Sequence, residues 1–464
     1  MRREGDTTVK TSFSCAAALA ACGLLLATAG PAAAADPEPS VVQEILGVLK
    51  ERGLVDEEDY QRMLARYAAG EKQRQSLIPK LRFYGDLRLR GEGFVYDEDP
   101  VAGHTPDRLR ARYRLRIGSD ADVTDFATVH FRLASSQGNA NGVGDPRSSN
   151  ISFGNQPDFA PGQIYIDRAN LELKAPSSWI PLERGSASLD VGKIGNPFVW
   201  KPIRDLMLWD PDISPEGAAL RVSGEAAQGL DLFFNGGWLI DQENAASKDP
   251  YLLGAQLGGS FQVSKTLLLG ARTTWYGFRA LNQNFICRGA TGANCNGTPG
   301  PTASGGNIPD GVSTATNGGQ MNVGELGAYL TWKGFENWPV TLWGDVGQNF
   351  TGRSSARLGH GSESLAWSTG LAVGDKSKLI ELGLAYFWVE ANAFPSQFVE
   401  SDWIDGRTNH RSLVFWTLKR LFANTDLQTM VSFQNSINDA LPEFRNSVSQ
   451  ADRIRFQTDL MVSF

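Results

Sequence analysis

Residues 109–117 read LRARYRLRI, and they decide the fold because apolar and basic side chains alternate at every position. A period of two residues is that of a β-strand whose two faces differ in polarity. Residues 82–90, RFYGDLRLR, show a similar alternation. Such strands occur in soluble sandwiches, with the apolar face on a core, and in membrane barrels, with that face towards lipid. Alternation alone does not separate the two.

Strand length and loop rhythm favour the membrane barrel. Segments 229–241 and 265–279 are much longer than the usual globular strand of about 5–6 residues, whereas tilted membrane strands need about 9–11 residues. Long loops rich in Gly, Asn, Asp and Pro alternate with tight turns, as in outer-membrane barrels. Aromatic side chains, which favour membrane–water interfaces, recur at the strand ends: Trp238, Trp275, Tyr276, Trp332, Trp338, Trp388 and Trp416.

The last segment, residues 456–464, also alternates and ends in Phe464. A terminal strand of this kind resembles the signal read by the outer-membrane assembly machinery, which we expect as a partner. We predict an all-β fold, a closed antiparallel transmembrane β-barrel of about 16 strands over residues 81–464, because an even number closes without an edge in lipid. About 14 or 18 strands remain compatible with the boundary errors. The predicted strands are 82–93, 109–118, 123–135, 163–174, 186–195, 217–224, 229–241, 251–263, 265–279, 321–333, 339–350, 363–374, 378–390, 409–420, 425–436 and 452–464.

Residues 1–35 are predicted to be a secretory signal peptide. Basic residues precede an apolar run over 12–30, and Ala33, Ala34 and Ala35 offer a small-residue cleavage site. An alternative is lipidation at Cys22, because LAAC resembles a bacterial lipoprotein cleavage box.

Residues 36–76 are predicted to form a short helical segment in the periplasm. Val41 to Leu49 have a helical apolar period that Gly53 ends. Asp56 caps a second helix, which we expect to end at Gly70. Two short helices that bury little carry no evident chemistry.

Two cysteines remain in the exported chain. Cys287 and Cys295 lie in a loop rich in Gly, Asn and Thr. In an oxidising compartment two cysteines at this spacing most simply form a disulfide, which we predict. No metal-ligand spacing is present, and we expect neither a metal nor a cofactor.

The order of these parts resembles the "putative porin" family of Gram-negative outer-membrane proteins. The resemblance is carried by residues 41–53, 56–70, 83–90, 107–114, 190–193 and 387–393. It implies a channel in the outer membrane for passive diffusion of small hydrophilic solutes and ions, assembled as a homotrimer. In porins of sixteen strands the third external loop folds inward and narrows the channel.

Basic side chains gather on one face of the first three predicted strands. A lipid-facing Arg costs about 2–4 kcal/mol at the bilayer midplane, so this face is predicted to line the pore. One interpretation is a ladder that attracts anions. The other is a structural ladder neutralised by Asp86, Glu172, Asp190, Asp231, Glu325, Asp345 and Glu381. The predicted pore-lining residues are Arg88, Arg90, Arg110, Arg112, Arg114, Arg116, His130 and Arg132, and we expect the basic face to extend to Arg221 and Arg272.

The third predicted external loop, residues 196–216, is unusually apolar for an exposed loop. By the family resemblance it would form a constriction. The alternative is that it packs on the barrel wall or on a neighbouring subunit. Its charged residues, predicted to set opposed charges at the constriction, are Lys201, Arg204, Asp205, Asp210, Asp212 and Glu216.

Enzyme signatures are absent from the sequence: there is no nucleophile elbow, zinc-protease motif, P-loop or dinucleotide fingerprint after a strand. The net charge of −7 offers no general attraction for nucleic acid. We therefore predict a non-enzymatic diffusion porin. The alternatives are a solute-specific channel for anions such as phosphate or carboxylates and, less well supported, a barrel enzyme, an adhesin or a soluble exported sandwich.

Overall fold

The computed structural model describes residues 41–77, 80–96, 107–137, 145–155, 157–200, 202–203, 207–245, 248–281, 307, 320–351, 361–438 and 452–464. The chain divides into two compact units, Met1–Ile78 and Pro79–Phe464. The predicted signal peptide over 1–35, the alternative lipidation site Cys22, and the predicted disulfide between Cys287 and Cys295 lie outside the described residues. None of the described helices is both long enough and apolar enough to cross a membrane.

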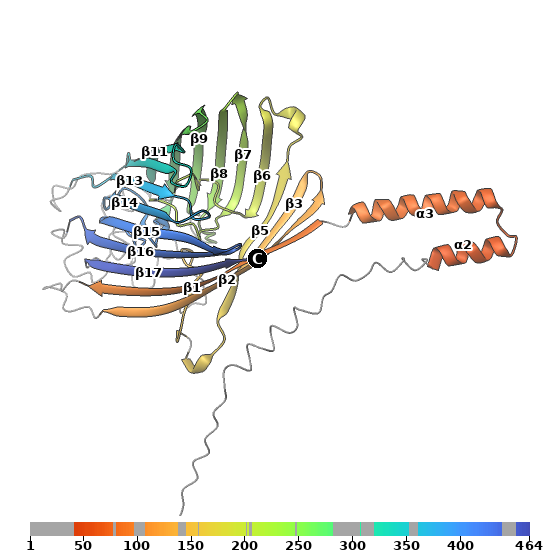
Figure 1. Ribbon diagram of the computed structural model, residues 1–464, viewed down its shortest axis with the longest axis horizontal. Helices are drawn as coiled ribbons and strands as arrows, with labels where there is room; N and C mark the ends of the chain where they lie inside the picture. The colour runs from red at the N-terminus through yellow and green to blue at the C-terminus, as the bar shows by residue number, and fades with distance from the viewer. Residues whose placement is uncertain are drawn as a thin grey trace, which may run out of the picture. The chain divides into compact units, whose positions relative to one another are not determined.

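The first unit contains two helices, α2 (Val41–Glu51) and α3 (Glu57–Leu77) (Figure 1). Asp56 caps α3 as predicted, because its Oδ1 accepts a hydrogen bond of 2.8 Å from the backbone N–H of Asp59. The predicted end of this helix at Gly70 is wrong, since α3 continues to Leu77. A glycine inside a helix costs only about 1 kcal/mol relative to alanine, and the Glu, Lys, Gln and Arg residues that follow favour the helix.

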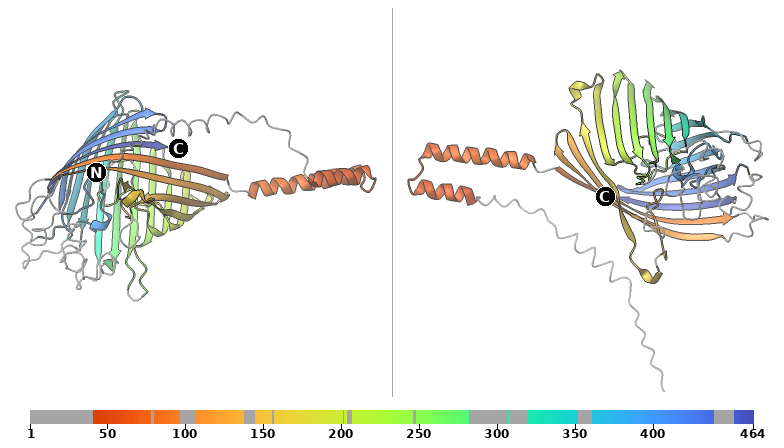
Figure 2. Two further views of the ribbon diagram at one scale, coloured as in Figure 1. Left: turned by 90° about the horizontal axis from the view of Figure 1, so that it is seen from below. Right: turned by 180° about the vertical axis from the view of Figure 1, so that it is seen from behind.

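The second unit is a closed antiparallel barrel (Figures 1 and 2). Within the described residues sixteen long strands pair in chain order, and β1 closes the ring by pairing with both β2 and β17. A further two-residue strand, β4, pairs only with β2. The predicted sixteen-strand barrel is therefore confirmed. The strands are β1 (Lys80–Tyr96), β2 (Arg108–Thr124), β3 (Ala127–Ser136), β4 (Ile151–Ser152), β5 (Gln163–Lys174), β6 (Glu183–Lys193), β7 (Glu216–Ala227), β8 (Leu230–Ile240), β9 (Tyr251–Ser264), β10 (Leu267–Arg279), β11 (Met321–Trp332), β12 (Val340–Asn349), β13 (Leu365–Gly374), β14 (Glu381–Val389), β15 (His410–Phe422), β16 (Thr425–Ser436) and β17 (Arg453–Ser463).

The last strand is joined to the first at the short-turn end of the barrel. The backbone N–H of Gly85 donates to the carbonyl of Phe464 at 2.8 Å, and the N–H of Phe464 donates back at 3.0 Å. Tight turns connect strands at this end, as between Phe422 and Thr425. In the described part of the connections lie three short 3-10 helices, η1 (Pro157–Phe159), η2 (Ser177–Trp179) and η4 (Ser396–Phe398).

The barrel wall has apolar side chains on its outer face and charged side chains on its inner face, which is the reverse of the arrangement in a soluble protein. Leu89 and Ile117 are 44% and 47% exposed, whereas Arg88 and Arg90 on the opposite face are 7% and 3% exposed. An apolar exterior around a charged interior suits a barrel whose outer surface contacts lipid. Other exposed apolar side chains on the strands are Val129, Phe131, Leu171, Val191, Leu220, Phe234, Leu257, Leu326, Leu342, Leu384, Phe415, Phe433 and Phe456.

Two of the aromatic residues predicted at the membrane interfaces lie inside the barrel instead. Tyr276 is 0% and Trp416 is 2% exposed. Trp416 fits because Gly383 opposite it carries no side chain: a Cβ there would lie 1.8 Å from the Trp416 ring. Trp238 and Trp275, in contrast, are exposed on the outer face. Aromatic identity at a strand end does not determine which face a residue occupies, and a shift of one residue reverses it.

Candidate pore constriction

Two loops at the long-loop end turn into the barrel. They are the described residues of 194–215, between β6 and β7, and residues 390–409, between β14 and β15. The first leaves the wall just after Gly192, whose φ is +124°. A Cβ at Gly192 would lie 2.4 Å from the carbonyl oxygen of Ala169 on the neighbouring strand. Glycine is therefore required where the chain departs from the wall.

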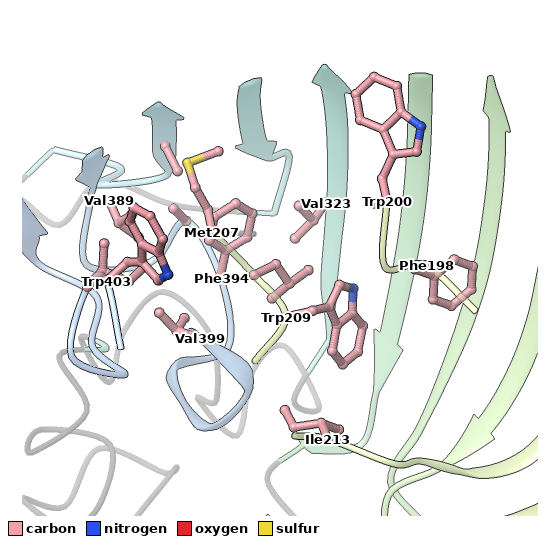
Figure 3. Close-up of a cluster of buried hydrophobic side chains, with 14 of the residues drawn as sticks. Phe198, Trp200, Met207, Trp209, Ile213, Val323, Val389, Phe394, Val399 and Trp403 are labelled. Atoms are coloured by element: carbon pink, nitrogen blue, oxygen red, sulfur yellow. The ribbon is translucent and has the colours of Figure 1, made fainter. Parts of the chain in front are cut away.

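The infolded loops pack together against one side of the inner wall (Figure 3). Trp209 of the first loop lies 5.5 Å from Phe398 of the second, between ring centroids, and 5.8 Å from Tyr276 on β10. Its Nε1 donates a hydrogen bond of 3.1 Å to the Tyr276 hydroxyl. Burying such side chains stabilises the packed loops by about 1.5–3 kcal/mol each. The first loop thus both enters the barrel and packs on the wall, so the two sequence interpretations are compatible.

Hydrogen bonds join three loop segments, here called the loop layer: residues 145–150, 209–213 and 396–406. Asp210 is central, because its N–H donates to the Phe398 carbonyl at 3.0 Å and its Oδ2 accepts from the Ser401 N–H at 3.0 Å. Arg147 donates to the carbonyls of Ser396 and Gly406 at 3.1 and 2.7 Å. The layer is therefore held by backbone groups as well as by side chains.

A cavity of about 280 Å³ separates the loop layer from the basic part of the wall. Arginines from four wall strands line it on one side, and the loop layer lines the other side with Arg147 and with carboxyl groups. A narrow space lined by fixed charges of both signs is the geometry expected of a pore constriction. The lining residues are Arg88, Arg114, Arg116, Arg132, Arg147, Asn150, Arg168, Asp210, Pro211, Asp212, Glu400, Ser401 and Asp402.

Most of the basic face is paired with carboxylates. Arg114 and Arg116 reach Asp86 at 2.8 and 2.7 Å, and both also reach Asp212 of the first infolded loop at 3.3 and 3.4 Å. Elsewhere on the predicted face, Arg90 pairs with Asp402 and Asp459, Arg110 and Arg112 pair with Glu92, His130 contacts Asp120 and Glu172, and Arg132 pairs with Asp167.

Of the seven carboxylates predicted to neutralise the wall, four pair with an arginine: Asp86, Asp190 with Arg221 at 2.9 Å, and Glu325 and Asp345 with Arg272. Glu172 contacts Lys174 and His130, and Glu381 accepts a hydrogen bond from Trp416 Nε1. No ion pair of Asp231 is found among the described residues. Sequence reasoning missed Glu92 and Asp459, although each shares a strand face with predicted inner residues and the period of two would have found them.

The loop acids differ in their ionisation. Burial, together with the neighbouring charge of Asp212, raises the pKa of Asp210 to about 8. Burial and the charges of Asp402 and Asp210 raise the pKa of Glu400 well above its usual value. Burial opposes ionisation of Asp212 as well, but Arg114 and Arg116 prevail and lower its pKa. At neutral pH Asp210 and Glu400 are thus largely uncharged. Asp212 is an ionised carboxylate, and so is Asp402, whose pKa is also lowered.

The predicted constriction residues separate into three groups. Asp210 and Asp212 line the cavity. Glu216 is the first residue of β7, is exposed, and pairs with Lys193 at 3.1 Å at the rim. Lys201, Arg204 and Asp205 lie outside the described residues.

Raising the pH should weaken any preference of the pore for anions. Asp210 is neutral below its pKa of about 8 and negative above it, and it faces Asp212, Glu400 and Asp402 across the loop layer. We expect the anion-to-cation permeability ratio to fall between about pH 6 and 10, with its midpoint near the Asp210 pKa. Reversal potentials in a salt gradient measure the ratio. Asp210→Asn should abolish the step; an unchanged step in that variant would contradict the assignment.

Comparison with known proteins gives one family match. The model of the putative porin family matches residues 95–296. No match is found among curated proteins. Similar solved structures include OprB of Pseudomonas putida (11% identity, TM-score 0.48, 86% of this chain and 97% of that chain), the anion-selective porin from Comamonas acidovorans (9%, 0.46, 83% and 100%) and the outer-membrane channel DcaP of Acinetobacter baumannii (11%, 0.42, 83% and 97%).

The matched residues 95–296 contain the first infolded loop and five of the six arginines that line the cavity. The same stretch runs from the end of β1 to beyond β10 in the closed barrel. Over these residues the chain is similar to the putative porin family, and the fold that contains them is a closed antiparallel β-barrel of sixteen long strands.

Proposed function

We propose that the barrel is a water-filled channel through which small hydrophilic solutes and ions diffuse passively across the outer membrane. The observation that carries this proposal is that three cavities are lined by residues of the barrel wall and the infolded loops. A cavity of about 680 Å³ lies towards the short turns, lined by residues such as Arg184 and Glu225. The constriction of about 280 Å³ lies at mid-height. A cavity of about 640 Å³ lies towards the long loops, lined by residues such as Asp241.

The opposed charges at the constriction support passage of hydrated solutes. A constriction lined by charged groups on both sides keeps water and small polar solutes in the passage. It also excludes large or apolar molecules. We expect purified protein in planar bilayers to give discrete conductance steps with an approximately linear dependence on salt concentration. If heat-modifiable gel migration shows that the protein is folded but no conductance steps are recorded, the channel proposal is refuted.

Neutralising the central arginines should shift the pore towards cations. In the double variant Arg114→Gln/Arg116→Gln, Asp86 and Asp212 lose their partners and add negative charge to the constriction. We expect the anion-to-cation permeability ratio to fall several-fold, as read from reversal potentials. Arg110→Gln is the control, because Arg110 does not line the cavity. An equal shift in both variants would mean that the constriction does not set the selectivity.

The alternative, a channel specific for phosphate-like or carboxylate anions, differs in its selectivity. A specific channel excludes other small solutes, whereas a diffusion channel also passes neutral and cationic ones.

Topology and assembly are part of the proposal. Because Lys80 and Phe464 both lie near the short turns, and such turns face the periplasm in outer-membrane barrels, we infer that the helical segment is periplasmic. The homotrimer implied by the family resemblance remains a prediction, which the mass in detergent by light scattering tests.

A further inference from the structure

Three arginines at the constriction have no carboxylate committed to them. Among the described residues, Arg147 and Arg168 have no carboxylate oxygen within 4.0 Å, and the nearest to Arg88 belongs to Asp402, at 4.0 Å. All three line the cavity of about 280 Å³. They come from two separate wall strands, β1 and β5, and from the loop layer, so the fold brings them together from distant parts of the sequence.

Each of the three side chains is positioned by contacts that leave guanidinium hydrogens available. Arg88 is 9% exposed in its side chain and donates one hydrogen bond of 2.8 Å to Asn150, while its buried Nε has no partner. The Arg168 guanidinium packs over Gly195, within 3.2–3.4 Å of where a Cβ would lie, and its Nε is likewise buried without a partner. Buried guanidinium groups with no committed carboxylate are costly, and an anion that enters the cavity compensates their charge.

The charge balance of the cavity is positive. Its six arginines face four loop acids, with Asp86 and Asp167 reaching the same wall arginines from the side. Burial keeps Asp210 and Glu400 largely neutral at pH 7. Guanidinium groups therefore outnumber ionised carboxylates, and the excess is located at Arg88, Arg147 and Arg168.

We propose that this cavity is an oxyanion-binding site of the channel, in which a small carboxylate or phosphate solute is held by Arg88, Arg147 and Arg168 during its passage. The planar guanidinium fork matches the oxygen pairs of both anions. A cavity of about 280 Å³ admits an anion of a few heavy atoms with some of its water. The inference rests on the proposed channel function and adds a substrate class to it.

Binding is tested on the intact, detergent-purified protein by isothermal titration with inorganic phosphate and, separately, with succinate. The double variant Arg88→Gln/Arg168→Gln should weaken binding by at least about tenfold, since charge-assisted hydrogen bonds are lost. Arg168→Lys keeps the charge but not the fork, and should give an intermediate loss. The control is Arg221→Gln, because Arg221 lines the neighbouring cavity of about 680 Å³ and is paired with Asp190.

The two anions identify the source of the oxyanion chemistry: tighter binding of phosphate indicates a phosphate-type solute, and tighter binding of succinate a carboxylate. Failure of both to bind the wild type, or equal binding by wild type and double variant, overturns the site. Conductance measured in parallel separates the two proposals. Steps without anion binding leave the channel intact and remove the site, whereas binding without steps removes the channel and retains the site. Heat-modifiable migration confirms that each variant is folded.

Discussion

Replacing Arg272 with methionine is expected to lower the free energy of unfolding by about 3–5 kcal/mol, because it leaves two buried carboxylates without their cation. Arg272 on β10 donates to Glu325 at 2.9 Å and pairs with Asp345, and the three side chains are 2%, 2% and 1% exposed. The Arg272 guanidinium also lies 5.5 Å from the ring centroid of Trp200 in the first infolded loop. Urea unfolding in detergent, followed by tryptophan fluorescence and gel migration, measures the loss.

Two further variants make this prediction specific. Arg82→Met removes an ion pair with Asp122 in which the arginine side chain is 52% exposed. Solvent screens that pair, so unfolding should be unchanged within error. Combining Arg272→Met with Glu325→Gln and Asp345→Asn removes the uncompensated charges and should recover much of the stability. A triple variant no more stable than Arg272→Met would show that the loss comes from packing and not from buried charge.

Replacing Trp209 with alanine is expected to widen the channel. Trp209 is 3% exposed and holds the first infolded loop through ring contacts with Tyr276, Phe278 and Phe398. Removing a buried tryptophan costs about 3–5 kcal/mol. Because Trp209 lies in the loop, this loss weakens the packing of the loop on the wall and not the pairing of the strands. We expect a larger single-channel conductance, noisier open states and passage of larger neutral solutes in liposome swelling.

The matched control lies on the outer face of β10. Trp275 precedes Tyr276 on β10 but points outwards, with 42% of its surface exposed. Trp275→Ala removes the same side chain without touching the loop layer, so its conductance should equal that of the wild type. If Trp209→Ala conducts no better than Trp275→Ala, the loop is not held in the lumen by this ring cluster.

Strand positions were predictable because alternation is a local property. The segments 163–174 and 425–436 have the predicted bounds exactly as the structure has them, and each residue's face follows from its parity along the strand. The overlong helix α3 and the inward positions of Tyr276 and Trp416 were missed for a common reason. Each of these predictions rested on the type of a single residue. The sequence after Gly70 decides the length of α3, and the neighbouring strand decides which face the aromatic side chains occupy.

Only part of the candidate site could be predicted from the sequence. The inner arginines followed from the cost of placing charge in lipid. Their partners did not: Asp402 reaches Arg90 from a loop 312 residues away in sequence, and Arg455 reaches Glu92 across the junction between the first and last strands. Arg147 carried no alternation signal at all, since it lies in a loop and its place depends on the carbonyls of Ser396 and Gly406.

The sequence by itself determined that this chain is a barrel with an apolar exterior and a charged interior, because the side-chain period of a strand and the cost of charge in lipid act on each segment separately. Tertiary structure alone decided which of the inner charges cancel. Closure of the ring and entry of two loops bring acids to within 4 Å of most arginines, where Coulomb attraction is strong, and leave Arg88, Arg147 and Arg168 beyond that distance or at its limit.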